Sequence, residues 1–113
     1  MKSIDGALIG GDPIFLAEGA KIAKAARAAK VPAIFPWRDF HEHGVLMSYG
    51  PDLREVARRA AYYVDKILKG AKPADLPVEQ VTKVDLIIDL RVADEMGIKL
   101  PQELLLRADE VLR

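Results

Sequence analysis

The sequence has no cysteine, which excludes disulfide bonds, cysteine-ligated metals and thiol catalysis. It also has no excess of charge of either sign, because 17 lysine and arginine residues balance 17 aspartate and glutamate residues. An overall basic field that could attract nucleic acid or anionic lipid is therefore absent. Nothing approaches the roughly 20 apolar residues that cross a bilayer, and the first residues, MKSID, lack the apolar core of a signal peptide. Either the protein is cytoplasmic, or an export signal lies upstream of this sequence.

The composition that remains is that of a folded globular domain. Of the 113 residues, 50% are hydrophobic and 30% are charged. A chain of this length is typical of one domain, which buries about two-thirds of its unfolded surface. We therefore expect most of the chain to be ordered.

The first third of the chain alternates short apolar runs with a helix-forming stretch. Residues 4–9 (IDGALI) end at a Gly-Gly-Asp-Pro turn and predict a buried strand. Residues 13–30 are rich in alanine and lysine and predict a helix, which ends before the Val-Pro pair at 31–32. Residues 33–36 predict a second strand. This order implies a parallel pair of strands with a right-handed crossover.

The remainder of the chain predicts a long amphipathic helix between two strands. The strands are expected at residues 45–49 and 84–90, and a short helical turn at 92–96 precedes a last helix at 101–112. Between the strands, residues 51–69 carry apolar side chains every three or four positions, which predicts a helix with one apolar stripe. The stripe consists of Leu53, Val56, Ala57, Ala60, Ala61, Val64, Ile67 and Leu68.

The predicted fold class is α/β, with a mostly parallel sheet of only three or four strands. An ordinary sheet has five or six strands. A parallel strand also needs both faces and both neighbours covered. We therefore expect that part of the domain is missing or that a second chain supplies it.

Five stretches together resemble one family. They are IDGALIGGDP at 4–13, VPAIFP at 31–36, GVLMSYGPDL at 44–53, AAYYVDKILKGAKPADLPVEQ at 60–80 and DLRVADEMGIKLP at 89–101. In order and spacing they resemble the type I periplasmic-binding-protein-like ABC transporter substrate-binding proteins, in the branch that contains tryptophan-type binders. The resemblance covers nearly the whole chain, but only the C-terminal third or so of a full-length member.

The resemblance implies a partial Rossmann-like, three-layer lobe of a type I periplasmic binding protein. Full-length members have two such lobes, and their chain crosses a hinge several times. Residues 1–43 would form a strand–helix–strand unit of the second lobe, 44–50 a hinge crossing, 51–70 a helix on the first lobe, and 71–113 the tail strand and C-terminal helices. The sequence would then be a natural truncation, a fragment or an engineered single lobe.

The same resemblance implies a non-catalytic function without cofactor or metal. Family members bind a small organic solute such as an amino acid and deliver it to an ABC permease, as periplasmic proteins or extracellular lipoproteins. This chain would supply half of the ligand cleft. We therefore expect it to bind ligand weakly or not at all alone, and to self-associate through uncovered strand edges and apolar faces.

The candidate ligand-binding residues follow the predicted strands, where ligands bind in open α/β sheets. Asp12, with Pro13 beside it, matches a recurrent acidic position of the family, and it could accept a ligand hydrogen bond or only cap a helix. Trp37 offers a stacking face and Arg38 a carboxylate clamp, although both could simply lie at the surface.

Three further positions concern the inferred hinge and tail. Ser48 and Tyr49 would lie at the hinge, where they could contact ligand or serve the hinge alone. Asp89 stands where the family usually has asparagine, which can donate as well as accept a hydrogen bond. This difference weakens any expectation that Asp89 contacts ligand.

Two other functions stay open from the residues alone. One is a self-associating α/β half-domain with no ligand activity of its own. The other is a small metal-dependent enzyme that uses Asp12 with Asp39, His41 and His43, because the last three would project to one side of an extended segment. This spacing matches no recognised metal motif, and no nucleophile, P-loop or dinucleotide motif is present. We therefore expect a solvated loop there and no enzyme activity.

Overall fold

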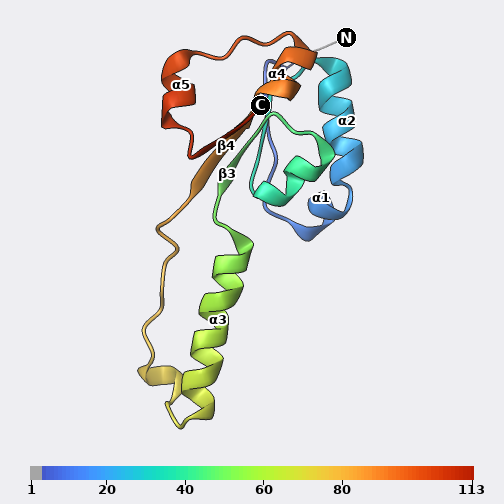
Figure 1. Ribbon diagram of the computed structural model, residues 1–113. Helices are drawn as coiled ribbons and strands as arrows, with labels where there is room; N and C mark the ends of the chain where they lie inside the picture. The colour runs from blue at the N-terminus through green and yellow to red at the C-terminus, as the bar shows by residue number, and fades with distance from the viewer. Residues whose placement is uncertain (1–3) are drawn as a thin grey trace.

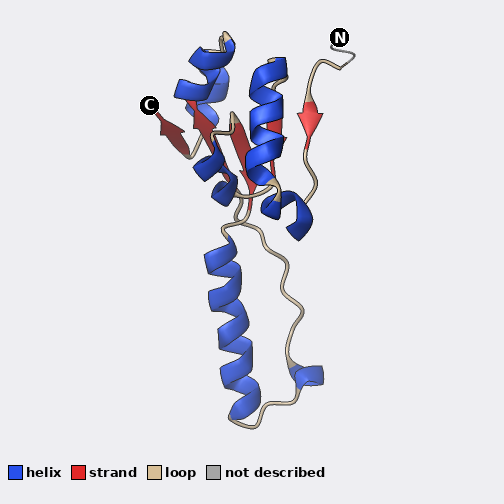
Figure 2. Ribbon diagram, turned by 90° about the vertical axis from the view of Figure 1, so that its right-hand side faces the viewer, coloured by secondary structure: helices blue, strands red, loops and turns tan. Residues whose placement is uncertain are grey.

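Five strands form one sheet in the computed structural model, which describes residues 4–113 (Figures 1 and 2). Adjacent strands are parallel except for the third and fourth, which are antiparallel. The predicted α/β class and mostly parallel sheet are confirmed, with one or two more strands than expected. In their order across the sheet, the strands are β1 (Ala7–Leu8), β2 (Ala33–Phe35), β3 (Met47–Gly50), β4 (Asp85–Asp89) and β5 (Glu110–Leu112).

Helices lie on both faces of this sheet. One face carries α1 (Pro13–Ala17), α2 (Gly19–Ala29) and the 3-10 helix η1 (Arg38–His43), whereas α5 (Gln102–Arg107) lies on the other (Figures 1 and 2). Helix α4 (Leu90–Met96) follows β4 directly and contacts α2. This is the layered arrangement that the resemblance implied. Within residues 4–113, no helix is long and apolar enough to cross a membrane.

The single helix predicted over residues 13–30 is two helices. Helix α1 ends at Ala17 with Glu18 as its C-cap, and α2 begins at Gly19, which is buried. A Cβ atom at Gly19 would lie 2.8 Å from a ring carbon of His43, so the glycine lets η1 approach the start of α2. Helix α2 ends at Lys30, whose left-handed backbone has a φ of 53°, as the following Val-Pro pair predicted.

The core lies between α2 and the sheet and continues under α4. The rings of Phe35 and Phe40 pack with their centroids 4.9 Å apart and fill the space beneath α2. A buried aromatic ring contributes about 150–250 Å² of apolar area, so these two rings are large contributors to the core. The first buried cluster contains Ala23, Ala33, Phe35, Phe40 and Val45, and the second contains Leu46, Val92, Ala93 and Met96.

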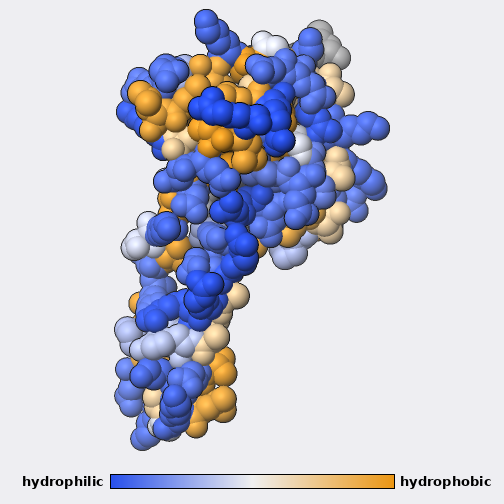
Figure 3. All heavy atoms as spheres, in the orientation of Figure 1, coloured by the Kyte–Doolittle hydropathy of each residue, from blue (hydrophilic) through white to orange (hydrophobic). Residues whose placement is uncertain are grey.

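A long arm projects from the carboxyl end of β3. It consists of α3 (Leu53–Leu68), the 3-10 helix η2 (Pro73–Asp75) and a return segment, residues 76–84, and it stretches the molecule to 57 Å (Figure 1). The long helix is confirmed, although Asp52 caps it and Pro51 precedes the cap. Not one residue of α3 is buried against the rest of the described chain. Hydrophobic residues are exposed near the free end of the arm (Figure 3), where 81% of Leu68 is accessible.

The return segment is tied to α3 by one polar cluster. The Arg59 guanidinium forms an ion pair with Glu79 and lies 3.9 Å from the ring centroid of Tyr62. The Tyr63 hydroxyl donates a hydrogen bond to the carbonyl oxygen of Pro77 at 2.7 Å. These contacts hold the two halves of the arm side by side without an apolar core.

The prediction of one helix over residues 101–112 is wrong beyond Arg107. Ala108 is extended, and the backbone N–H of Asp109 donates to the carbonyl oxygen of Leu86 at 2.8 Å. The Asp109 carboxylate in turn accepts from the Leu86 N–H at 2.7 Å. Pairing with the free edge of β4 satisfies these backbone groups, so tertiary contacts override the local helical pattern. The strand predicted at 4–9 is also shorter, with only Ala7–Leu8 paired, and it is an exposed edge strand and not a buried one, because 81% of Leu8 is accessible.

Replacement of Gly50 by alanine should destabilise the fold. A Cβ atom at this position would lie 1.9 Å from the carbonyl oxygen of Pro36, so β2 and β3 would have to separate. Overpacking of this kind costs about 1–3 kcal/mol, which urea unfolding would detect as a lower midpoint. Gly10→Ala is the control, because its Cβ would meet Phe15 at an ordinary 3.8 Å. Equal midpoints for the two variants would contradict the steric argument.

Candidate functional site

One edge of the sheet collects most of the predicted ligand-binding residues. Because β4 and β5 run opposite to β1–β3, the carboxyl ends of the first three strands and the amino ends of the last two meet at this edge. The arm leaves the body at the same place (Figure 1). Gly50, the last residue of β3, is paired with Asp85, the first residue of β4. The edge is therefore the place where loops of different strands can act together.

Asp12 and Pro13 lie in the loop that follows β1. The Asp12 carboxylate accepts a hydrogen bond from the backbone N–H of Ile14 at 2.9 Å and caps α1, and Pro13 occupies its first turn. Both residues are exposed. The capping role proposed from the sequence is confirmed. Because the cap engages one oxygen of an exposed carboxylate, it leaves room for a ligand contact at the other.

Trp37 connects this loop to η1. Its ring stacks on Phe40, with an interplanar angle of 20° and centroids 6.2 Å apart. A Cβ atom at Gly11 would lie 3.4 Å from the indole, so the loop that carries Asp12 packs against Trp37. The structure therefore brings Asp12 and Trp37 onto one surface, with the indole half-buried.

Arg38 forms an ion pair that sequence analysis did not predict. Its Nη2 atom donates to Oε2 of Glu110 at 2.8 Å, and 34% of the arginine and 45% of the glutamate side chain are exposed. Arg38 also borders a hollow of about 510 Å³ at the base of the arm and a smaller one of about 270 Å³ beside β4 and β5. Glu110 was missed because residues 108–112 were predicted to be helical, which would have placed it away from this edge.

Ser48 and Tyr49 have opposite environments on β3. Ser48 is 1% exposed, and its hydroxyl shares a hydrogen bond with Nε2 of His41 at 2.9 Å. Tyr49 is 54% exposed. Successive strand residues point to opposite faces, so these two side chains cannot meet the same ligand surface. The Ser48 hydroxyl already has a partner inside the protein.

His41 is the residue whose importance the sequence did not reveal. It is half-buried, and its Nδ1 atom is buried without a hydrogen-bond partner in the described part of the chain. Burial lowers the pKa of His41, although the carboxylates of Asp89 and Glu110 oppose this effect. The lowered pKa favours a neutral ring at neutral pH, and its bond to Ser48 ties η1 to β3.

Asp89 has a structural role at the end of β4. It is 2% exposed and caps α4, accepting hydrogen bonds from the backbone N–H of Arg91 at 2.9 Å and from its guanidinium at 2.9 and 3.0 Å. Burial raises the pKa of Asp89, but the Arg91 hydrogen bonds outweigh it and hold the pKa below its ordinary value. An acceptor suffices for a cap, which accounts for aspartate at this position.

The metal-site hypothesis assumed an extended segment, and that assumption is wrong. Asp39, His41 and His43 lie on η1, where alternate residues do not share a side. Among residues 4–113, no three histidine, aspartate or glutamate side chains are placed to hold a metal ion. The expected solvated loop is also corrected: Phe40 is completely buried and anchors the segment.

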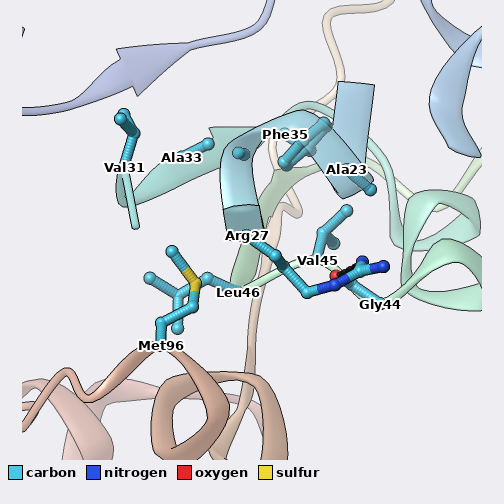
Figure 4. A pocket seen from close by; sticks show the side chains of 10 residues that line it. Ala23, Arg27, Val31, Ala33, Phe35, Gly44, Val45, Leu46 and Met96 are labelled. Carbon is cyan, nitrogen blue, oxygen red and sulfur yellow. Dashed lines mark hydrogen bonds between the residues drawn. The ribbon is translucent and has the colours of Figure 1, made fainter. Parts of the chain in front are cut away.

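An apolar pocket lies inside the body rather than at the edge. It is bordered by α2, the residues before β3 and Met96 of α4 (Figure 4), and its volume of about 10 Å³ holds no more than a water molecule. Arg27 lies across it and donates hydrogen bonds to the carbonyl oxygens of His43 and Gly44, both at 2.6 Å. This pocket is a packing defect and not a ligand site.

The lowered pKa of His41 predicts a loss of stability in mild acid. The unfolded chain takes up a proton near pH 6.5 and the folded chain only at lower pH, so stability is full above pH 6.5 and falls below it. The urea midpoint of the wild type should therefore fall with pH between about pH 7.5 and 5, and His41→Gln should remove this slope. His43→Gln is the control and should keep the slope, because His41 remains. A slope that survives His41→Gln unchanged would contradict the assignment.

Solved structures with the same fold come from several bacteria. A conserved domain protein from Vibrio cholerae O1 biovar El Tor is 29% identical, with a TM-score of 0.88, and the match covers 95% of this chain and 36% of that one. An ABC domain in complex with L-Trp from Streptococcus pneumoniae is 25% identical, with a TM-score of 0.87, covering 97% and 37%. A ligand-free, open substrate-binding protein with adhesive properties from Clostridium difficile shares the fold at 21% identity and a TM-score of 0.60, covering 93% and 35%.

The matches cover nearly all of this chain but only part of each solved structure. The chain spans about a third of the length of each solved structure that it matches. No curated protein matches it significantly. The family described as ABC transporter substrate binding protein matches residues 1–112, nearly the whole sequence. The chain therefore belongs to the ABC transporter substrate-binding protein family.

Proposed function

We propose that this chain forms one wall of the ligand cleft in the substrate-binding component of an ABC-type importer. The observation that carries the proposal is that Asp12, Trp37 and Arg38 follow the neighbouring strands β1 and β2 at one sheet edge. Of these three residues, Arg38 also borders the hollow of about 510 Å³ at the base of the arm. Small-molecule sites typically have volumes of about 300–1,000 Å³ and a few convergent polar groups. In open α/β sheets such sites lie at the carboxyl ends of the strands.

The opposite wall is proposed to come from a first lobe. In this proposal, residues up to 43 belong to the second lobe, residues 44–50 cross the hinge, and α3 packs on the first lobe before the tail returns through β4. The uncovered apolar stripe of α3 supports the assignment, because a helix with no buried residue gains nothing from its apolar side chains. The similarity to solved chains nearly three times as long also supports it.

The ligand is proposed to be an amino acid or a similar small organic solute. One solved relative is described as a complex with L-Trp. At the site of this chain, Trp37 could stack on an apolar group and Arg38 could bind a carboxylate. The complete protein would deliver the solute to a membrane permease, as a periplasmic protein or an extracellular lipoprotein. No catalytic step is proposed.

The isolated chain should bind L-tryptophan only weakly. With half of a cleft we expect a Kd of about 1 mM or weaker, observable as shifts of the Trp37 indole N–H and of the residue 10–12 amides in NMR spectra. A calorimetric Kd in the micromolar range would contradict the half-cleft interpretation. Absence of any shift at this edge at ~10 mM ligand would overturn the proposed site.

Replacement of Asp12 by asparagine separates capping from ligand binding. Asparagine caps helices as well as aspartate does, so the free energy of unfolding in urea should stay within about 0.5 kcal/mol of the wild type. Loss of the charge should weaken L-tryptophan binding about threefold or more, measured from the NMR titration. Asp94→Asn, on the exposed side of α4, is the matched control. Equal L-tryptophan affinities in both variants would show that Asp12 is only a cap.

Self-association is the second candidate function. The stripe of α3 that would face a first lobe is open in this chain, with Val64 55% and Ile67 41% exposed. A second copy could cover it, and exposed apolar surface of this kind favours association.

Charged substitutions on the stripe should abolish this association. We expect sedimentation of the wild type at about 100 μM to give a mass above that of one chain, because two stripes bury each other. Val64→Lys combined with Leu68→Lys should give the mass of one chain. Asp65→Lys makes the same change in net charge outside the stripe and should leave the mass unchanged. A wild type that sediments as one chain would count against self-association.

A further inference from the structure

We propose that Glu110 is a specificity-determining residue, which pairs with Arg38 so that the sheet-edge site selects zwitterionic ligands over simple anionic carboxylates. This inference rests on the proposed function, because it concerns the same site. It assigns a role to a residue 72 positions away from Arg38 in the sequence.

The geometry of the ion pair leaves both groups able to bind a further partner. Arg38 contacts Glu110 through Nη2 alone, at 2.8 Å, and a guanidinium has five N–H donors. Glu110 contributes only Oε2 to the pair. Both side chains are more than a third exposed. A ligand can therefore reach the pair without breaking it.

The position of Glu110 is fixed by the fold. It opens β5 and is in register with Ile87 of β4, and the preceding Asp109 exchanges two hydrogen bonds with Leu86. The carboxylate therefore sits on a paired strand and not on a mobile tail. A residue held in this way can discriminate between ligands, because moving it aside would break strand pairing.

The charge around Arg38 disfavours a simple anion. Glu110 cancels the charge of Arg38, and the smaller hollow beside the pair is bordered by Asp85 and Asp109 against one further cation, Lys83. A carboxylate that approaches Arg38 is thus attracted by the guanidinium and repelled by the neighbouring carboxylates.

A zwitterion matches the same pair. In an α-amino acid, the ammonium and carboxylate groups are attached to one carbon, so their separation is comparable with that of the two charged groups of the pair. The ligand can lie antiparallel to the pair, with its carboxylate on the free donors of Arg38 and its ammonium on Glu110. Both contacts are then attractive, which is the basis of charge-pattern specificity.

The experiment compares two probes that differ in one group. L-Tryptophan and indole-3-propionate share the indole and the carboxylate, but only the first carries an ammonium. NMR titrations of the full chain, followed at the Trp37 indole and the Arg38 Nε–H, give a Kd for each probe. We expect the wild type to bind L-tryptophan more tightly. Glu110→Gln should reduce this preference about three- to fivefold, by weakening L-tryptophan and strengthening indole-3-propionate.

Two further variants separate charge from structure. Glu103→Gln removes an equivalent carboxylate from the exposed pair with Arg107 on α5 and should leave the preference unchanged. Glu110→Asp keeps the charge and should keep most of the preference. Glutamine has nearly the shape of glutamate and position 110 is half-exposed, so we expect the fold to be retained. The same spectra check this.

The possible results are distinct. An unchanged preference in Glu110→Gln, with both probes still binding, would overturn the role of Glu110 and leave the proposed function standing. A preference lost equally in Glu110→Asp would show that charge is not the determinant and would also overturn the inference. If neither probe shifted the Trp37 indole of the wild type, the proposed site and this inference would fall together.

Discussion

The antiparallel pairing of β3 with β4 is the constraint on which the rest of the structure depends. It joins the strand–helix–strand unit of the first half of the chain to the tail, with Met47 opposite Ile88 and Gly50 opposite Asp85. Because this pair alone reverses direction, the carboxyl ends of three strands and the amino ends of two meet at one edge. The same reversal leaves 34 residues to form the arm, since residues 51–84 lie between the paired strands. The antiparallel pairing of β3 with β4 therefore explains why the candidate site and the arm lie next to each other.

Many charged groups in this chain are held by local partners, and three ion pairs join distant segments: Arg27–Glu95, Arg38–Glu110 and Arg59–Glu79. Asp12, Asp52 and Asp89 each cap the helix that follows, within two residues. The Arg38–Glu110 pair instead joins η1 to β5 across most of the sequence. Long-range ion pairs at an exposed edge add little to stability. The Arg38–Glu110 pair instead holds one positive and one negative group at defined positions on this edge.

The sequence predicted the elements whose signals are local. The apolar stripe of α3 and the Val-Pro pair after α2 indicated boundaries to within a few residues. The prediction failed where distant contacts decide. Residues 108–112 have helical spacing, yet they pair with β4, and Glu110 could not be assigned to the site without that pairing. His41 was judged by its neighbours in sequence, whereas its environment is set by the distant Ser48, Asp89 and Glu110.

The arm is attached to the body by two strands that leave the sheet side by side, one after Gly50 and one before Asp85. A single crossing would permit both bending and rotation about its own axis. Two adjacent crossings, whose continuations are tied together partway along the arm by the Arg59–Glu79 ion pair, resist such rotation. Any displacement of the arm relative to the sheet edge therefore has to pass through these two adjacent crossings, at Gly50 and Asp85.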